Sequence, residues 1–133
     1  MTFTELNEVR TLKKQIAAEK QKITALRDSI NSVTSKLEPT PKGTTTESRI
    51  EVLAVLIVDT EAKINRLQAR LQQAVPELTE KILAEKLDSA EQTLLINRYI
   101  ACKYFRDIGF LMGYSENWIY WKHNQILKKI RAD

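Results

Sequence analysis

The sequence predicts an all-α protein, in which a long antiparallel helical hairpin, or coiled coil, precedes a helix-turn-helix domain. Three observations support this fold class. The 133 residues include only three glycines and three prolines, apolar residues recur every seven positions before residue 80, and two of the glycines lie four residues apart near the end. We place the division after residue 75, so that 1–75 form the hairpin and 76–133 form the helix-turn-helix domain.

The first predicted helix runs from Phe3 to Leu37 and carries a heptad seam. The seam positions are Val9, Ile16, Ile23, Ile30 and Leu37, with Leu12, Leu26 and Val33 at the second seam position. Such a seam, sustained over four heptads, is typical of a coiled coil. Glu19 interrupts it, which favours a fixed register over maximal stability.

A loop at about residues 38–47 separates this helix from a second one. The stretch "EPTPKGTTTE" contains two prolines and a glycine, which are typical of loops. The heptad then resumes, with one exception at Thr60. Its seam positions are Ile50, Ile57, Ile64, Leu71 and Leu78, with Leu53, Leu67 and Ala74 at the second position.

The length of the loop decides how the two helices can pair within one chain. A helix from residue 3 to 37 is about 52 Å long at the standard rise of 1.5 Å per residue. Ten extended residues span at most about 35 Å, so the chain cannot return to its start for parallel pairing. Pairing within one chain is therefore antiparallel, and the alternative is that each helix pairs with another subunit.

The second helix has more apolar surface than one seam uses. Val52, Val55 and Val58 point away from the Ile50–Ile57–Ile64 stripe on a helical wheel. A helix that is apolar on more than one side needs more than one partner. We expect this face to be the oligomerisation surface of a homo-oligomer, with a dimer favoured; the alternative is that it docks the C-terminal part of the chain.

Pro76 is expected either to begin a new helix or to kink the existing one. The stretch "ELTEKILAEKL" continues helically to Leu87. Either Asp88 or Ser89 then has the character of an N-cap, because Glu91 and Gln92 follow. The helix begun by this cap is expected to run to about Tyr104.

The last third has the spacing of a helix-turn-helix. Gly109 falls where the second helix crosses the first closely, and Gly113 falls in the turn, where a left-handed conformation is needed. Ser115 suits the N-cap of the second helix, which we place at about 115–131. The apolar residues spaced to hold the two helices together are Ile108, Met112, Tyr114 and Ile119.

Composition narrows the class of function. Residues 92–133 hold seven Lys and Arg against three Asp and Glu, so the whole net charge of +4 lies there and indicates an anionic partner. The longest apolar run, Val52–Val58, is too short to span a bilayer, and no signal peptide is visible, so a cytoplasmic location is expected. We see no enzyme constellation and expect no cofactor and no metal. His123, the only histidine, is expected to be either a hydrogen-bonded residue at the core edge or a phosphate contact, and Cys102, the only cysteine, is expected to pack.

The wheel of the last helix separates two faces. Ile119, Ile126 and Ile130 share one side and are predicted to be core, whereas Asn117, Trp121, Asn124 and Lys128 share the other. Trp118 lies nearer the core edge and is expected to pack, and packing remains an alternative for Trp121. The candidate DNA-binding residues are Ser115, Glu116, Asn117, Trp118, Tyr120, Trp121, Lys122, Asn124, Gln125 and Lys128, with Lys103 and Arg106 before the turn.

The stretch from Leu87 to Arg131, with "RY", "DIG", "GYS" and "LKKIR", resembles the fourth region of sigma-70-type factors. The whole chain resembles small phage and prophage proteins of Gram-positive bacteria, some of which are late-operon transcriptional activators. The resemblance implies duplex DNA and host RNA polymerase as partners. Trp121 departs from the pattern, because sigma factors carry a hydrogen-bonding residue there, so their promoter preference is not carried over.

Three functions are therefore open. The first is a sequence-specific DNA-binding transcriptional regulator, in which 1–75 is the oligomerisation region and 76–133 the DNA-binding domain. The second is a phage DNA-packaging subunit of the small-terminase type, which also joins a helix-turn-helix to oligomerising helices but forms rings of eight or more. The third is a protein that binds RNA polymerase without reading bases.

Overall fold

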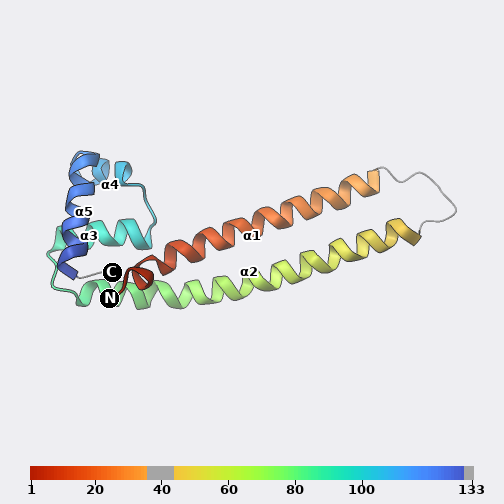
Figure 1. The fold of residues 1–133 in the computed structure, drawn as a ribbon, viewed down its shortest axis with the longest axis horizontal. Coiled ribbons are helices and arrows are strands. Elements are labelled where there is room, and N and C mark those ends of the chain that lie inside the picture. The colour runs from red at the N-terminus through yellow and green to blue at the C-terminus, as the bar shows by residue number, and fades with distance from the viewer. Residues whose placement is uncertain (36–43, 131–133) are drawn as a thin grey trace. The chain divides into compact units, whose positions relative to one another are not determined.

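The computed structural model describes residues 1–35 and 44–130, and every regular element in these ranges is a helix (Figure 1), which confirms the all-α prediction. The elements are α1 (Phe3–Ser35), α2 (Thr44–Ala84), α3 (Ser89–Leu95), the π-helix η1 (Ile96–Ile100), α4 (Phe105–Met112) and α5 (Glu116–Ile130). The predicted loop at 38–47 lies outside the described residues up to position 43, and its last four residues belong to α2.

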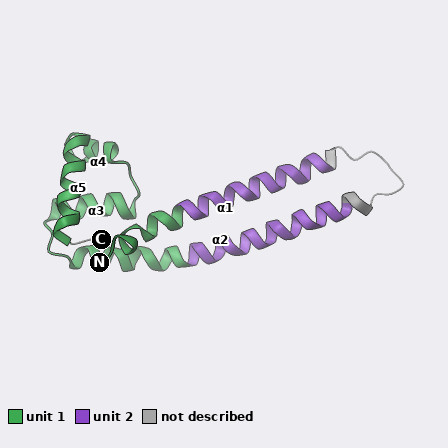
Figure 2. Ribbon diagram, viewed as in Figure 1, with its two compact units in different colours: residues 1–13, 70–133 green, residues 14–69 purple. Residues whose placement is uncertain are grey.

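The chain divides into two compact units (Figure 2). Unit 1 combines residues 1–13 with 70–133, and unit 2 comprises residues 14–69. Both α1 and α2 therefore contribute to each unit. The boundary that the sequence suggested, after residue 75, falls inside α2.

Unit 2 consists of two antiparallel helical segments joined by cross-helix ion pairs. The Arg27 guanidinium lies 3.0 Å from the Glu61 carboxylate, and the Lys63 ammonium lies 2.9 Å from Glu19. The seam residues Ile16, Ile23 and Ile64 are buried here. Glu19, the exception in the heptad, is also buried, and Lys22 and Lys63 both neutralise it. The hydrogen bond from Lys63 is the main reason that the pKa of Glu19 is lowered.

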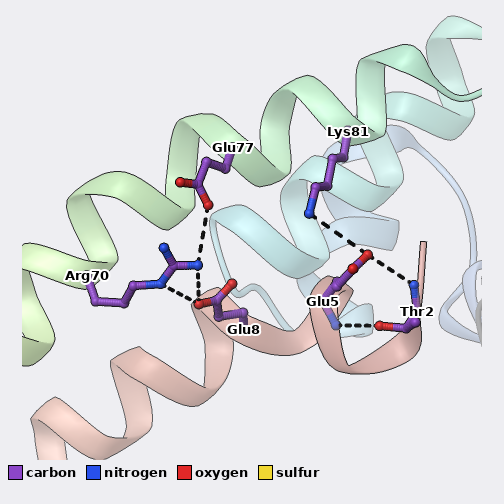
Figure 3. A network of polar contacts seen from close by, with 6 residues as sticks. All are labelled: Thr2, Glu5, Glu8, Arg70, Glu77 and Lys81. Carbon is purple, nitrogen blue, oxygen red and sulfur yellow. Dashed lines mark hydrogen bonds and ion pairs between the residues drawn. The ribbon is translucent and has the colours of Figure 1, made fainter.

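In unit 1 the start of α1 packs against the end of α2 (Figure 3). The residues buried in these two segments are Leu6, Val9, Ala74, Leu78 and Ile82. Polar contacts line its edge: the Arg70 guanidinium lies 2.6 Å from Glu8 and 3.3 Å from Glu77, and Lys81 lies 3.9 Å from Glu5. Thr2 and Glu5 also exchange hydrogen bonds in a capping arrangement at the start of α1.

Pro76 does not begin a new helix, because α2 runs through it from Thr44 to Ala84. A proline in a helix interior removes one backbone hydrogen bond and crowds the carbonyl four residues earlier, at a cost of about 3 kcal/mol. Burial of Ala74, Leu78 and Ile82 on either side of Pro76 supplies the packing that holds α2 helical here. The helix ends at Ala84, three residues before the predicted Leu87.

The third helical segment begins where the sequence predicted and ends earlier. Asp88 is the N-cap of α3: its carboxylate accepts from the Glu91 amide at 2.8 Å, and Glu91 accepts in return from the Asp88 amide at 3.1 Å. The segment continues as η1 only to Ile100, whereas the prediction reached Tyr104. The reason is Cys102, whose φ of 58° places it in the left-handed region and turns the chain away from the helix.

Candidate nucleic-acid interface

The pairing of α4 with α5 depends on two glycines with different roles. A Cβ atom on Gly109 would stand 2.7 Å from the Tyr114 carbonyl oxygen, closer than real contacts allow. Gly113 has a φ of 78° and ends α4, with open space around it. The Tyr114 amide then donates to the Gly109 carbonyl at 2.8 Å. Gly109 therefore permits the close approach of the two helices, and Gly113 permits the left-handed turn. Both glycines have the roles that the sequence predicted for them.

One face of α5 anchors it to the rest of unit 1. Ile119, Ile126 and Ile130 are buried, as the sequence predicted, and His123 is buried beside them. Ser115 acts as the predicted N-cap, because its hydroxyl accepts from the Trp118 amide at 3.2 Å. The anchored face and the cap together fix which side chains α5 exposes.

The opposite face of α5 is exposed and polar, with one tryptophan at its centre. Asn117, Trp121, Asn124 and Lys128 are exposed at helical spacing, and Trp121 keeps 55% of its surface accessible. Gln125 is exposed on the flank of this stripe. We call these five residues the outward stripe. The segment Asn117–Ile130 contains no acidic residue.

The other aromatic side chains near the turn divide between packing and exposure. Trp118 is half-buried and stacks on Tyr114, with ring centroids 3.8 Å apart and an interplanar angle of 15°. Trp118 therefore packs, as expected, whereas Tyr114 remains 46% exposed rather than buried between the helices. The Trp118 and Trp121 centroids are 6.4 Å apart. Tyr120 leans on Phe105 at 4.3 Å and keeps 48% of its surface exposed.

Two lysines of α5 already have an acidic partner. The carboxylate of Glu91, which is buried in α3, lies 2.9 Å from the Lys129 ammonium and 3.7 Å from that of Lys122. The hydrogen bond from Lys129 is the main cause that lowers the pKa of Glu91, so it is ionised at neutral pH. The sequence assigned Lys122 to a phosphate contact and Glu91 only to a helix cap. It contains no local signal that they meet, because 31 positions separate them.

His123 belongs to the core and not to the outward stripe. Its imidazole shares a hydrogen bond with the Tyr99 hydroxyl and lies edge-on to Phe105, with centroids 4.9 Å apart. Its pKa is lowered to about 4, mainly by burial and secondly by the nearby Arg98 charge, while the Asn124 side chain partly offsets these effects. His123 is therefore neutral at physiological pH. Among the described residues, no group of histidine, cysteine and acidic side chains could hold a metal ion.

Three basic residues, Arg98, Lys103 and Arg106, lie before α4 or in its first turn. Arg106 is exposed and Lys103 is half-buried. Arg98, which the sequence did not single out, lies 4.0 Å over the Phe105 ring and donates to the Lys103 carbonyl at 3.1 Å. Burial is the main cause that lowers the pKa of Arg98. Its guanidinium thus fixes the backbone that presents Lys103 and Arg106.

The predicted oligomerisation residues belong to unit 2. Val52, Val55 and Val58 on α2 are 56%, 58% and 62% exposed, and Leu56 beside them is 44% exposed. Val52, Val55 and Leu56 share a shallow surface depression with Ser48 and Glu51. Within the described residues, nothing covers this apolar face.

The structure thus brings together a buried anchor, a capped and closely packed turn, and an outward stripe of amides, one tryptophan and one lysine. Arg98 fixes the backbone that carries Lys103 and Arg106, and Glu91 pairs with Lys122 and Lys129, two lysines of α5 outside the stripe. In the described ranges no helix is long and apolar enough to cross a membrane. No protein-family model, no curated protein and no solved structure matches the chain.

Proposed function

We propose that this protein is a sequence-specific regulator of transcription that binds duplex DNA through α5. The observation that supports the proposal most is the division of α5 into two faces. Ile119, Ile126 and Ile130 anchor the helix, and an acid-free stripe of hydrogen-bonding side chains faces outward. A helix presented in this way suits the major groove, which admits one α-helix and displays base edges.

Each part of the stripe has a chemical role in such a complex. Asn117, Asn124 and Gln125 carry amides that can bond base edges, and the Trp121 ring can contact a thymine methyl group. Lys128, together with Arg106 and Lys103 near α4, would neutralise phosphates. Lys122 and Lys129 contribute less, because Glu91 already pairs with them.

The resemblance to sigma-70 region 4 and to phage and prophage activators sets the biological context of the proposal. It suggests a regulator of phage or prophage genes that acts together with host RNA polymerase. The exposed Val52, Val55 and Val58 suggest that the regulator binds as a homodimer. A dimer would match a two-fold symmetric operator.

The salt dependence of DNA binding tests the proposal. We would measure binding to a random 30-base-pair duplex by fluorescence anisotropy. The logarithm of the association constant should fall with the logarithm of salt concentration, with a slope near −0.9 for each phosphate neutralised. Lys128→Ala should make the slope shallower by about 0.9, whereas Lys20→Ala, at an exposed position on α1, should leave it unchanged. Affinity that does not change with salt would contradict any role in DNA binding.

A second function is favoured by one specific observation, the exposure of Phe110 and Leu111. These α4 side chains are 93% and 59% exposed, beside the turn. Exposed apolar side chains in a folded domain are candidates for a protein contact, here with RNA polymerase. If the protein binds polymerase without reading bases, Phe110→Ser should abolish polymerase binding, and Asn117→Ala should leave the genomic binding profile unchanged.

A further inference from the structure

We infer that α5 selects A·T-rich DNA, with adenine read by its amides and thymine by its tryptophan. This inference rests on the proposed DNA-binding function and names the base composition of its target. The basis is a contrast between two sets of side chains on α5. The amide side chains are exposed, whereas two of the lysines are paired with a carboxylate of the same protein.

The hydrogen-bonding groups at the base-reading end of the stripe are amides. Asn117 and Asn124 are exposed on the same side of α5, and Gln125 flanks them. An asparagine or glutamine side chain both donates and accepts, so it matches the N6 donor and N7 acceptor of adenine in a bidentate pair. Guanine presents two acceptors at the same edge, so an amide cannot pair with it in this way.

The groups that read guanine are missing or occupied. Guanine is read mainly by arginine or lysine. The described helix Glu116–Ile130 contains no arginine, and Lys122 and Lys129 are paired with Glu91. Lys128 is unoccupied by any acid in the described residues, but it lies eleven residues after Asn117, about 16 Å along the helix axis. Base contacts come from the start of a recognition helix, so Lys128 reaches the phosphates instead.

Trp121 supplies the contact to thymine. It lies between Asn117 and Asn124 in helical phase, and 55% of its surface is accessible. The Tyr114–Trp118 stack lies on one side of it, with Trp118 and Trp121 centroids 6.4 Å apart. The thymine methyl group is the apolar feature of the major groove. An exposed indole beside two amides therefore matches an adenine–thymine step.

Within the described helix α5, Glu116 is the one carboxylate that could read cytosine, because a carboxylate accepts from the cytosine amino group. It precedes Asn117 by one residue and so lies about 100° around the helix from it. Glu116 therefore lies beside the outward stripe and not within it. In the first turn of α5 its negative charge is stabilised by the helix dipole.

Site selection followed by single-atom base replacement tests the inference. Binding rounds with the full-length protein and a randomised duplex should enrich a core of A·T pairs. In the selected site, replacing thymine by uracil removes one methyl group and should weaken wild-type binding about fourfold. Replacing adenine by 7-deazaadenine removes the N7 acceptor and should weaken it about tenfold.

Two variants assign these effects to residues. Trp121→Ala should bind the thymine and uracil sites equally, and Asn117→Ala should bind the adenine and 7-deazaadenine sites equally. Asn65→Ala, at an exposed position on α2, is the matched control and should behave as wild type. Thermal unfolding of each variant shows whether it is folded, and the two variants test the inference independently.

The outcomes separate this inference from the function on which it rests. A selected core rich in G·C pairs, or discrimination that survives in both variants, would overturn the inference and leave DNA binding intact. Binding without any sequence preference would overturn both the inference and the sequence-specific part of the proposed function, and would leave only general DNA binding. Failure to bind every duplex at low salt would instead overturn the proposed function.

Discussion

At the scale of single residues, Trp121 and Ile126 occupy opposite faces of one helix and should respond differently to truncation. Ile126 is fully buried, so Ile126→Ala should lower the free energy of unfolding by about 2–5 kcal/mol. Trp121 is 55% exposed, so Trp121→Ala should change it by about 0.5 kcal/mol or less. Denaturant unfolding monitored by circular dichroism measures both. A large loss in Trp121→Ala would mean that the indole packs in the core.

His123 should make the free energy of unfolding depend on pH, and this dependence should begin at a higher pH than that of the carboxylates. Burial holds its pKa at about 4 in the folded protein, below its ordinary value of 6.5. The unfolded chain therefore takes up this proton first, and stability should fall as the pH drops from about 6.5 to 4. The lowered pKa values of Glu19 and Glu91 act in the same direction, but only below about their ordinary value of 4.5.

The measurement is the melting temperature between pH 7 and pH 4.5 for the wild type and for His123→Gln. The wild type should lose stability across this interval. The variant keeps a polar partner for Tyr99 and has no titrating group at this position, so its melting temperature should change less. Parallel curves would show that His123 is accessible to protons in the folded state.

At the scale of elements, Glu91 links α3 to α5 and restrains two cations of the proposed DNA-binding helix. Glu91→Gln keeps the capping interaction with Asp88, since glutamine also serves in a capping box, but removes the charge that Lys122 and Lys129 meet. Two lysines then become available to phosphates. We expect a lower melting temperature, stronger binding to random duplex DNA, and a log–log salt slope steeper by up to about 1.8.

The matched control for this prediction is Glu80→Gln, which removes an exposed acid from α2 and raises the net positive charge by the same one unit. An equal change in salt slope for both variants would indicate a general effect of net charge. A change confined to Glu91→Gln would assign the effect to the pairs with Lys122 and Lys129.

The elements also show how far sequence reasoning reaches. Heptad spacing identified Val9, Ile16 and Ile64 as seam residues, because one repeating period determines burial along a paired helix. The two glycines of the turn were identifiable for a similar reason, since close approach and positive φ each restrict the residue type. These features depend on local pattern alone.

Features that depend on contacts between distant residues were not predictable. The sequence left open whether the helix continues through Pro76, and the choice between the two outcomes depends on tertiary burial that outweighs a local helix-breaking tendency. The left-handed Cys102 ends η1 at a residue type with no preference for that conformation. The exposed face of α5 was predictable from helical spacing. The ion pairs of Lys122 and Lys129 with Glu91 were not, because contacts between residues far apart in the sequence produce no repeating pattern in it.

At the scale of the whole molecule, the exposed valines of α2 bear on the number of subunits. We expect the protein to self-associate through Val52, Val55 and Val58, since each keeps more than half of its surface exposed. Sedimentation velocity at high micromolar concentration should show a dimer, and Val55→Glu should show a monomer with unchanged helicity. A wild-type monomer would contradict the prediction, and a ring of eight or more would favour the packaging function.

The buried Glu19 of unit 2 has a mechanical consequence. A purely apolar seam would allow two antiparallel helices to slide past each other by one heptad, about 10.5 Å, with similar packing before and after. In one direction this step would move Glu19 from Lys63 to the position of Leu56 and leave a buried carboxylate without its cross-helix cation. The paired segments of unit 2 therefore resist translation by one heptad in that direction, so the buried carboxylate acts as a one-way stop on sliding.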